Sequence, residues 1–345
     1  MSTLRIPPPF SCGLFLTYRC TGECRHCMYA CSPRRGENWI DPVGARKVLT
    51  KLASSFREQY PPGFSRVGVN LGLHFTGGEP FLNFPLLRML VGMAKELEIP
   101  ATFVETNAHW CAEEEEAREK LLILREEGLD GLLVSVNPFT LEHVPFERAR
   151  LAVKVGREIF GGNLLVYQEG FFNWALRRGI RGTLRLERLL ELEGEEILAE
   201  LELLPRGRFP FRLGHLCTRY PAEHFLHRSC LDELTRSWHV HVDNYFNYLP
   251  GYCGGISLGD ARKLEFPAEL ELEDFPVIKA LTRSLGDLLK LGGDYGYRER
   301  EEGYVSACHL CADIRKHLVE QTKEFRELGP LEFYAFLEPP KSKSP

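Results

Sequence analysis

Three cysteines stand close together near the start of the chain, at Cys20, Cys24 and Cys27. Three and two residues separate them, so one loop can wrap their thiolates around a compact iron–sulfur cube. A [4Fe–4S] cluster usually takes four cysteines, and three would leave one iron open to an outside ligand. The same spacing suits a zinc loop completed by His26 or Cys31. The spacing by itself therefore leaves iron–sulfur and zinc open.

A second group of cysteines lies in the last third of the chain. Cys308 and Cys311 form a C-x-x-C pair, and Cys230 and Cys253 precede it, while Cys217 is an alternative to Cys230. Four thiolates suit either a [4Fe–4S] cluster or a zinc site. The chain has 11 cysteines, an odd number, and no visible secretion signal. Metal ligation is therefore favoured over disulfides.

Strands and helices must alternate to position these residues. Apolar runs predict six strands, over 13–17, 67–75, 101–105, 132–136, 163–168 and 197–204. Helical patterns lie between them at 42–56, 85–97, 113–127 and near 146–159, the first opened by Asp41 as N-cap. Such alternation predicts an α/β fold with a parallel sheet. Six units are too few for an eight-fold barrel, so we expect a partial (β/α)6 TIM-like barrel.

The alternation of predicted strands and helices ends after Gly207-Arg208. Only WHVHVD (238–243) indicates a strand there, while 276–291 and 304–320 look helical. We expect three parts: a core domain over 12–210, a smaller cysteine-bearing domain over 211–325, and a tail over 326–345, disordered from Pro339. His239 and His241 share one strand face, with Asp243 following. They are either metal ligands or satisfied polar strand residues.

The second predicted strand ends in Gly77-Gly78-Glu79-Pro80. Two glycines let a ligand approach the backbone, and the glutamate can accept hydrogen bonds from an ammonium group. C-x3-C-x2-C after one strand and GGEP after the next resembles the radical S-adenosylmethionine (radical SAM) superfamily over about residues 12–210. The resemblance implies an enzyme in which Cys20, Cys24 and Cys27 hold a [4Fe–4S] cluster that binds SAM.

The resemblance also implies roles for other residues. Gly77, Gly78 and Glu79 would cradle the SAM amino group, and His26, in place of the common Phe or Tyr, would lie near the adenine. Further SAM contacts would come from the ends of later strands, at Thr106, Asn107, Ser135 and Arg208. By their positions after the third and sixth predicted strands, Cys111, and after it Cys217, are candidates to return a hydrogen atom to a substrate radical; the alternative for each is a small buried apolar side chain.

The second cysteine group resembles the auxiliary-cluster domains of the SPASM/twitch branch. A full SPASM domain carries about seven cysteines, so the shorter twitch-like form with one auxiliary [4Fe–4S] cluster is the better match. In such relatives a cysteine commonly follows the Gly-Arg pair by about twenty residues, which favours Cys230 over Cys217. The ligands would then be Cys230, Cys253, Cys308 and Cys311, with His309 pointing away.

Composition narrows the function class. A net charge of −5 gives no reason to expect nucleic-acid binding, and no apolar run is long enough to span a membrane. We expect a cytoplasmic protein. The resemblance implies reduced ferredoxin or flavodoxin as electron donor, and a small-molecule or peptide substrate. About a dozen residues precede the first strand, which slightly favours a small substrate or a peptide delivered by another protein. Two alternatives stay open: an iron–sulfur electron-transfer or maturation protein without SAM cleavage, and a zinc-binding interaction protein.

Overall fold

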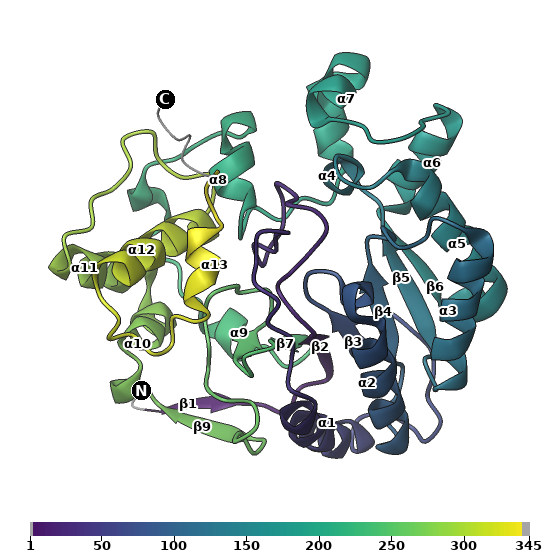
Figure 1. The fold of residues 1–345 in the computed structure, drawn as a ribbon. Coiled ribbons are helices and arrows are strands. Elements are labelled where there is room, and N and C mark those ends of the chain that lie inside the picture. The colour runs from purple at the N-terminus through teal and green to yellow at the C-terminus, as the bar shows by residue number, and fades with distance from the viewer. Residues whose placement is uncertain (1–2, 340–345) are drawn as a thin grey trace.

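The computed structural model describes residues 3–339, which form a mixed α/β fold with a largely parallel sheet. The sheet and its helices make up one side of the molecule, and a cluster of C-terminal helices makes up the other (Figure 1). The strands are β1 Thr3–Ile6, β2 Ser11–Phe15, β3 Gly72–Thr76, β4 Phe103–Thr106, β5 Gly131–Ser135, β6 Leu164–Tyr167, β7 Val240–Val242, β8 Tyr248–Pro250 and β9 Ala268–Glu271.

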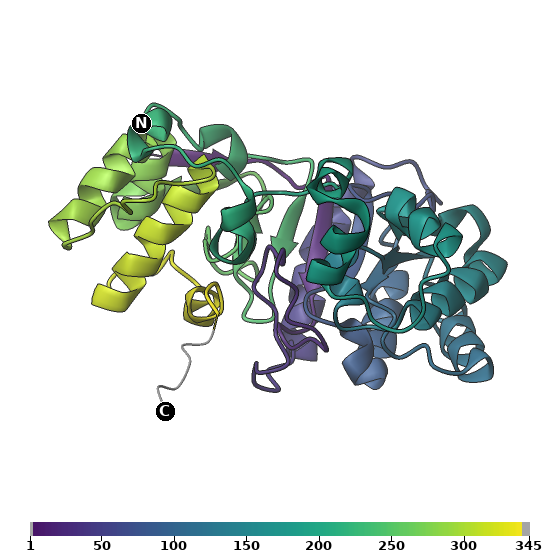
Figure 2. The same cartoon turned by 90° about the horizontal axis from the view of Figure 1, so that it is seen from above.

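The helices come mainly in two groups, one beside the sheet and one in the C-terminal part. They are α1 Pro42–Arg57, α2 Phe84–Glu96, α3 Glu114–Glu126, α4 Pro138–Leu141, α5 Phe146–Phe160, α6 Glu169–Arg177, α7 Leu186–Glu193, α8 Phe209–Leu213, α9 Leu231–Leu234, α10 Pro276–Arg283, α11 Leu285–Asp294, α12 Ala307–Gln321 and α13 Leu331–Ala335. Seen from above, α10–α12 stand apart from the sheet and its helices (Figure 2).

The main sheet has seven strands in the order β6-β5-β4-β3-β2-β7-β8. Strands β2 to β6 are parallel in chain order, as the alternating pattern predicts. The start of α1 is also as predicted, because the Asp41 carboxylate accepts a hydrogen bond from Gly44 N at 2.7 Å and Pro42 occupies the first turn. One face of the sheet packs against α1, α2, α3 and α5, which forms the main hydrophobic core.

The strand predicted at 197–204 is wrong. Gly194, at φ +76°, ends α7, and residues Glu195–Glu200 form a short 3-10 helix instead. Glutamates recur through this stretch, at positions 195, 196, 200 and 202, and only Ile197 between Glu195 and Leu204 is buried. A segment with so little apolar surface to bury gains little by extending the sheet beyond β6.

The remaining parallel strand is β7, which pairs with β2 on the side opposite β3. The segment WHVHVD is therefore a strand, as predicted, and lies in the main sheet. The domain boundary between residues 210 and 211 stays a prediction, because β7 and β8 follow that boundary yet complete the sheet that β2 begins. A separate antiparallel pair, β1 with β9, joins the N-terminal residues to the C-terminal half.

The first part of the predicted tail is folded. Helix α13 lies there, and Phe333, Tyr334 and Leu337 are buried. The prediction of disorder from Pro339 falls almost wholly on residues 340–345, outside those described. Among residues 3–339, none of the helices is long and apolar enough to cross a membrane.

Candidate functional site

The loop that carries Cys20, Cys24 and Cys27 follows β2 at the carboxyl end of the sheet, where ligands of parallel α/β folds gather. A turn joins two of the cysteines, since Cys27 N donates to Cys24 O at 3.2 Å. Two N–H groups approach the sulfurs: Cys31 N lies 3.4 Å from Cys27 Sγ, and Asn107 Nδ2 lies 3.6 Å from Cys20 Sγ. The structure thus provides N–H donors to thiolates held on one loop, and such bonds tune a bound cluster.

The three thiols differ in acidity. Burial raises the pKa of Cys20 to about 12, and burial also raises the pKa of Cys24. Hydrogen bonding from Cys31 and the nearby Arg208 charge lower the pKa of Cys27 to about 5 despite burial. The Cys31 thiol itself lies 3.4 Å from Gly77 O, to which it donates. Cys20 and Cys24 become thiolates when a cation is bound, because a metal ion deprotonates its thiol ligands.

Gly207 and Arg208 clamp the cysteine loop. Gly207 has φ +60°, and a Cβ there would lie 2.4 Å from Met28 O, so only glycine allows this approach. The fully buried Arg208 guanidinium donates to three carbonyls, Cys24 O, Cys31 O and Phe336 O, each at 2.9 Å. Its backbone N–H donates to Cys27 O. The observed partners of Arg208 are therefore the loop and the C-terminal segment, and its predicted contact with SAM stays a prediction.

Charged residues between the cysteines anchor the loop from outside. Glu23 pairs with Arg34 at 2.8 Å and with Arg212 at 2.6 Å. Burial opposes ionisation of Glu23, but hydrogen bonds from these two arginines and from Ser32 lower its pKa to about 2. On the other side, Arg25 pairs with Glu142 at 2.8 Å. Opposite charges on neighbouring residues therefore hold the loop to two different parts of the fold.

Gly77 and Gly78 pack directly on the segment that leads into the cysteine loop. A Cβ at Gly77 would lie 2.3 Å from Thr17 O, and one at Gly78 would lie 1.9 Å from Arg19 O. The amides of Gly78 and Glu79 donate to the carbonyls of Thr17 and Arg19, at 2.7 and 3.0 Å. The glycines are therefore needed for backbone-to-backbone packing, a role that the sequence did not indicate.

Glu79 is completely buried and joins the ends of β3 and β4. Its Oε1 accepts hydrogen bonds from Phe81 N at 3.1 Å and Thr106 Oγ1 at 2.9 Å, and its Oε2 accepts from Asn107 N at 2.9 Å. His109 Nδ1 lies 3.9 Å from Oε2. The carboxylate is therefore held firmly beside the cysteine loop.

Of the other residues predicted to contact SAM, some lie at the cysteine loop and others do not. Asn107 touches it directly, since Nδ2 donates to Thr21 Oγ1 at 2.9 Å. His26 is half-buried and stacks on Phe139, with ring centroids 4.7 Å apart, and desolvation lowers its pKa to about 4. Ser135 ends β5 in register with Tyr167, and none of the described hydrogen bonds joins it to the cysteine loop.

The structure brings together the four cysteines predicted for the second site. The pKa of Cys230 is raised first by burial and then by the nearby thiols of Cys311, Cys253 and Cys308. Two cations lie beside the group. Arg315 is buried, donates to Gly254 O at 3.0 Å and lies next to Cys311 and Cys253, and Arg206 lies next to Cys308 and Cys253. Positive charge at this position stabilises four thiolates or an anionic cluster.

The two hydrogen-donor candidates lie elsewhere. Cys111 is fully buried in the core, and the charges nearest to it belong to Lys120 and Glu116 of α3 and Arg148 of α5. It therefore lies on the helix side of the sheet. Cys217 is half-buried, and its nearest charge is Arg219, with no cysteine close to it. The geometry does not favour Cys217 over Cys230 as a ligand.

The spacing of the sulfur atoms bears on the zinc alternatives. In a tetrahedral zinc site with Zn–S bonds of about 2.3 Å, sulfurs lie about 3.8 Å apart. Among residues 3–339, no three cysteine sulfurs lie within 4.8 Å of one another. Within residues 3–339, neither cysteine group is therefore arranged for a single tetrahedral zinc ion in this structure.

One group of ligand atoms does meet that limit, and it combines His239 and His241 with His74 of β3. The sequence analysis missed His74, although its place in a predicted strand, between Leu73 and Phe75, puts it on the opposite face from them. Asp243, in contrast, accepts hydrogen bonds from Tyr18 OH and Asn247 N and lies outside the group.

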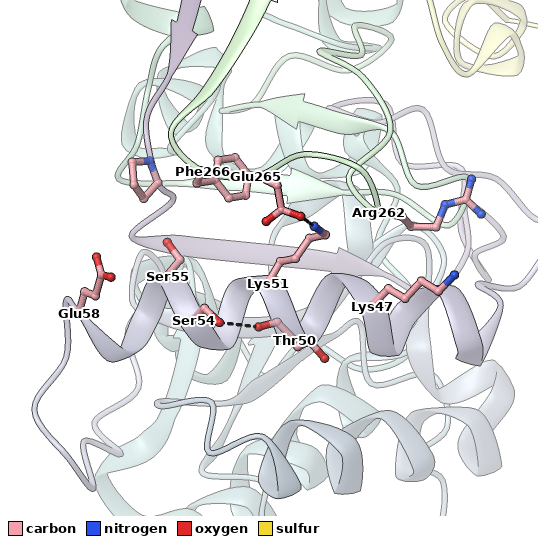
Figure 3. A pocket seen from close by; sticks show the side chains of 10 residues that line it. Lys47, Thr50, Lys51, Ser54, Ser55, Glu58, Arg262, Glu265 and Phe266 are labelled. Carbon is pink, nitrogen blue, oxygen red and sulfur yellow. Dashed lines mark hydrogen bonds and ion pairs between the residues drawn. The ribbon is translucent and has the colours of Figure 1, made fainter.

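A surface cleft of about 570 Å³ lies between α1 and the 262–266 loop (Figure 3). Lys47 and Lys51 of α1 and Glu58 at its end lie on one side of the cleft, Arg262 and Glu265 lie on the other, and an ion pair joins Lys51 to Glu265. None of the cysteines or histidines lines this cleft, so it is separate from the candidate sites.

Comparison with known proteins finds matches only among solved structures; no family model and no curated protein matches. BtrN in complex with AdoMet and 2-DOIA is 16% identical, with a TM-score of 0.39 over 74% of this chain and 80% of BtrN. The anSMEcpe structure with bound AdoMet is 12% identical, with a TM-score of 0.45 over 91% and 97%. Streptococcus suis SuiB bound to S-adenosylmethionine is 16% identical, with a TM-score of 0.44 over 87% and 77%.

Each of these three structures contains bound AdoMet or S-adenosylmethionine, and each TM-score lies below 0.5. At such low identities and TM-scores the matches say nothing about individual residues, so the roles of this chain's residues are argued from their own geometry.

Proposed function

We propose that this chain is a radical SAM enzyme whose substrate is a small molecule or a peptide. The observation that carries the proposal is the meeting of two loops at neighbouring strand ends. The loop with Cys20, Cys24 and Cys27 follows β2, and the Gly77-Gly78-Glu79 loop follows β3 and packs against it. A simple metal staple would not need a second loop that holds a fully buried carboxylate, Glu79, beside the cysteines.

The residues present fit a [4Fe–4S] cluster with one open iron, because three thiols, with three and then two residues between them, stand on one loop. When bound, such a cluster would supply the electron for reductive cleavage of SAM, which would give methionine and 5′-deoxyadenosyl radical chemistry at a substrate C–H bond. The protein holds the loop through Arg208 and donates N–H groups to two of the sulfurs. Burial of Cys20 and Glu79 excludes water from this side of the loop.

We further propose that Cys230, Cys253, Cys308 and Cys311 hold a second, auxiliary [4Fe–4S] cluster in a twitch-like domain. Their mutual proximity and the positive charges of Arg206 and Arg315 support this assignment. Four protein ligands would make that cluster an electron relay or a structural element. A reduced ferredoxin or flavodoxin is the proposed electron donor.

One observation favours a second candidate function, an iron–sulfur electron carrier that does not cleave SAM. Both oxygens of Glu79 already accept hydrogen bonds from Phe81, Thr106 and Asn107 within the protein. A carboxylate satisfied in this way is less available to the ammonium group of SAM. An enzyme would need Glu79 to exchange or share one of these bonds.

The experiment that separates the two candidates is SAM cleavage. Full-length protein is reconstituted anaerobically with iron and sulfide, reduced with dithionite and incubated with SAM. We expect 5′-deoxyadenosine and methionine in equal amounts by mass spectrometry, even without substrate. Cys24→Ala removes one ligand of the first cluster and should abolish the product, whereas the control Cys12→Ala changes a buried thiol of β2 outside both groups. Reconstituted protein that binds iron but gives no 5′-deoxyadenosine is the result expected of an electron carrier.

A further inference from the structure

Three buried histidines meet on the face of the main sheet opposite α1. His74 lies on β3 and His241 on β7, and both are in register with Gly13 of the strand between them. His239 lies two residues before His241, so it shares the same face. Their exposed fractions are 1% for His74, 1% for His239 and 3% for His241. The three imidazoles therefore form one cluster sealed from solvent.

Gly13 makes room for this cluster. A Cβ at that position would lie 2.6 Å from His74 Nε2 and 2.7 Å from His241 Nε2. Both Nε2 atoms therefore point at the same small space above the middle strand. Any larger residue at position 13 would fill the gap between the two nitrogens.

The ring spacing matches that of metal-bound imidazoles. Ring centroids lie 5.2 Å apart for His74 and His239, 4.6 Å for His239 and His241, and 5.5 Å for His74 and His241. Tetrahedral coordination with Zn–N bonds of about 2.1 Å, plus about 1.1 Å from nitrogen to ring centre, places centroids about 5 Å apart. One ligand nitrogen of each ring lies within 4.8 Å of the other two.

Hydrogen bonds fix which nitrogen is free on two of the rings. Ser11 Oγ donates to Trp238 O at 2.8 Å, so its remaining contact, with His239 Nδ1 at 2.6 Å, requires the histidine to donate. His241 Nδ1 lies 2.9 Å from Gly251 O, which can only accept. Neutral His239 and His241 therefore carry their protons on Nδ1. Histidine ligands of metals are oriented in the same way, by donation from the second nitrogen. The Tyr29 hydroxyl lies 2.9 Å from His241 Nδ1 and 3.4 Å from its Nε2, so a metal ion at that Nε2 would displace a weak contact with Tyr29.

His74 has no such partner within residues 3–339. Its buried Nδ1 makes no hydrogen bond, and its Nε2 is 3.7 Å from Glu105 Oε1, too far for one. A buried imidazole with neither nitrogen satisfied is costly unless a water or an ion binds it.

We propose that His74, His239 and His241 bind one divalent transition-metal ion through their Nε2 atoms. Three neutral imidazoles suit zinc and its neighbours in the first transition row. Glu105 stands at the edge of the site and outside the group of three, with Oε1 3.7 Å from His74 Nε2 and its other oxygen held by Thr76 Oγ1 at 2.6 Å. The site is distinct from both cysteine groups and does not depend on SAM cleavage.

The test uses full-length, reconstituted protein with its cluster iron in place. It is incubated anaerobically with Zn²⁺, freed of loose metal by gel filtration and analysed for zinc and iron. Wild-type protein should retain one zinc per chain that is absent from His74→Gln and from His241→Gln, with iron unchanged. The matched control is His227→Gln, an exposed histidine outside the cluster, which should retain the zinc. Because the result is a difference between variants, zinc bound at cysteines cancels.

X-ray absorption at the zinc edge of the wild-type protein provides a readout that needs no variant. We expect only nitrogen and oxygen neighbours, at about 2.0–2.1 Å, and no sulfur near about 2.3 Å. A zinc shell dominated by sulfur would place the ion at the cysteines and overturn the proposal. Wild-type protein that retains no zinc, or variants that retain as much as the wild type, would overturn it equally.

Discussion

The two cysteine groups are built in opposite ways. Cys20, Cys24 and Cys27 lie within eight residues of one loop, whereas the second group joins Cys230, Cys253 and the Cys308–Cys311 pair across more than 80 positions. The first loop is held by contacts to its backbone, above all from the single buried guanidinium of Arg208. The second group depends on the packing of separate segments, with Arg206 and Arg315 beside the thiols. A site on one loop can keep an open position, while a site assembled from several segments stabilises the fold that makes it.

Removal of the cysteines should have the largest effect and should separate the two groups most clearly. Cys20→Ala/Cys24→Ala/Cys27→Ala should lower iron from about eight to about four per chain and abolish SAM cleavage, because each cube holds four irons. Cys308→Ala/Cys311→Ala should also leave about four irons but retain SAM binding at the first loop. It should lower thermal stability more, because metal ligation that ties distant segments contributes folding free energy.

Iron analysis, 5′-deoxyadenosine formation and thermal unfolding measure these three properties. If the wild-type protein holds only about four irons, together with one zinc that disappears with Cys308 and Cys311, the auxiliary cluster is wrong and the second group is a zinc site. The assignment of the first loop would be unaffected by that result.

Substitution of one buried arginine at each group should have a smaller effect and should test whether each arginine supports only its own group. Arg208→Met leaves the carbonyls of Cys24, Cys31 and Phe336 without their charged donor, and each such bond contributes about 1.5–3 kcal/mol. We expect the first cluster to bind less iron and 5′-deoxyadenosine to fall at least about tenfold, equal to about 1.4 kcal/mol in the barrier. Arg315→Met, the matched change at the other site, should lower iron at the second group and spare SAM cleavage.

Cluster-specific electron paramagnetic resonance after reduction assigns the lost iron to one group or the other. Equal losses at both groups in either variant would mean that the arginines support the whole fold and not one site. Arg208→Lys should restore little of the iron binding or SAM cleavage that Arg208→Met loses, because the single ammonium group of a lysine cannot donate to three carbonyls at once.

Local patterns predicted the parts of the site that are local in sequence. The cysteine loop, the Gly77-Gly78-Glu79 loop and the five strands β2–β6 follow from apolar runs and short motifs, and the structure has them in that order. The sixth strand was misplaced because the apolar alternation at 197–204 looks like a strand until its neighbours are known. Only the structure shows that β6 is the sheet edge and that β7 pairs with β2.

Contacts between segments far apart in the chain could not be predicted from sequence patterns. His74 lies 165 positions before His239, and nothing in their local sequences links them. Arg208 was predicted from its motif, yet its partners were not, because carbonyls carry no residue identity that a pattern could reveal. The packing role of Gly77 and Gly78 likewise depends on how closely the 17–19 segment approaches, which is a tertiary property.

The smallest effect is expected outside both groups. Cys111 is fully buried near α3 and α5, and burial raises its pKa to about 12, so it stays a thiol and packs as a small apolar side chain. Cys217 lies beside Arg219 and apart from the four clustered cysteines. Cys111→Ala and Cys217→Ala should therefore leave about eight irons per chain and unchanged 5′-deoxyadenosine. Cys111→Ala should cost about 1 kcal/mol of stability from lost packing.

Loss of iron in Cys217→Ala, with retention in Cys230→Ala, would exchange these two cysteines in the second group. A change in the product made from substrate in Cys111→Ala, at constant iron, would return Cys111 to the reaction as a hydrogen donor.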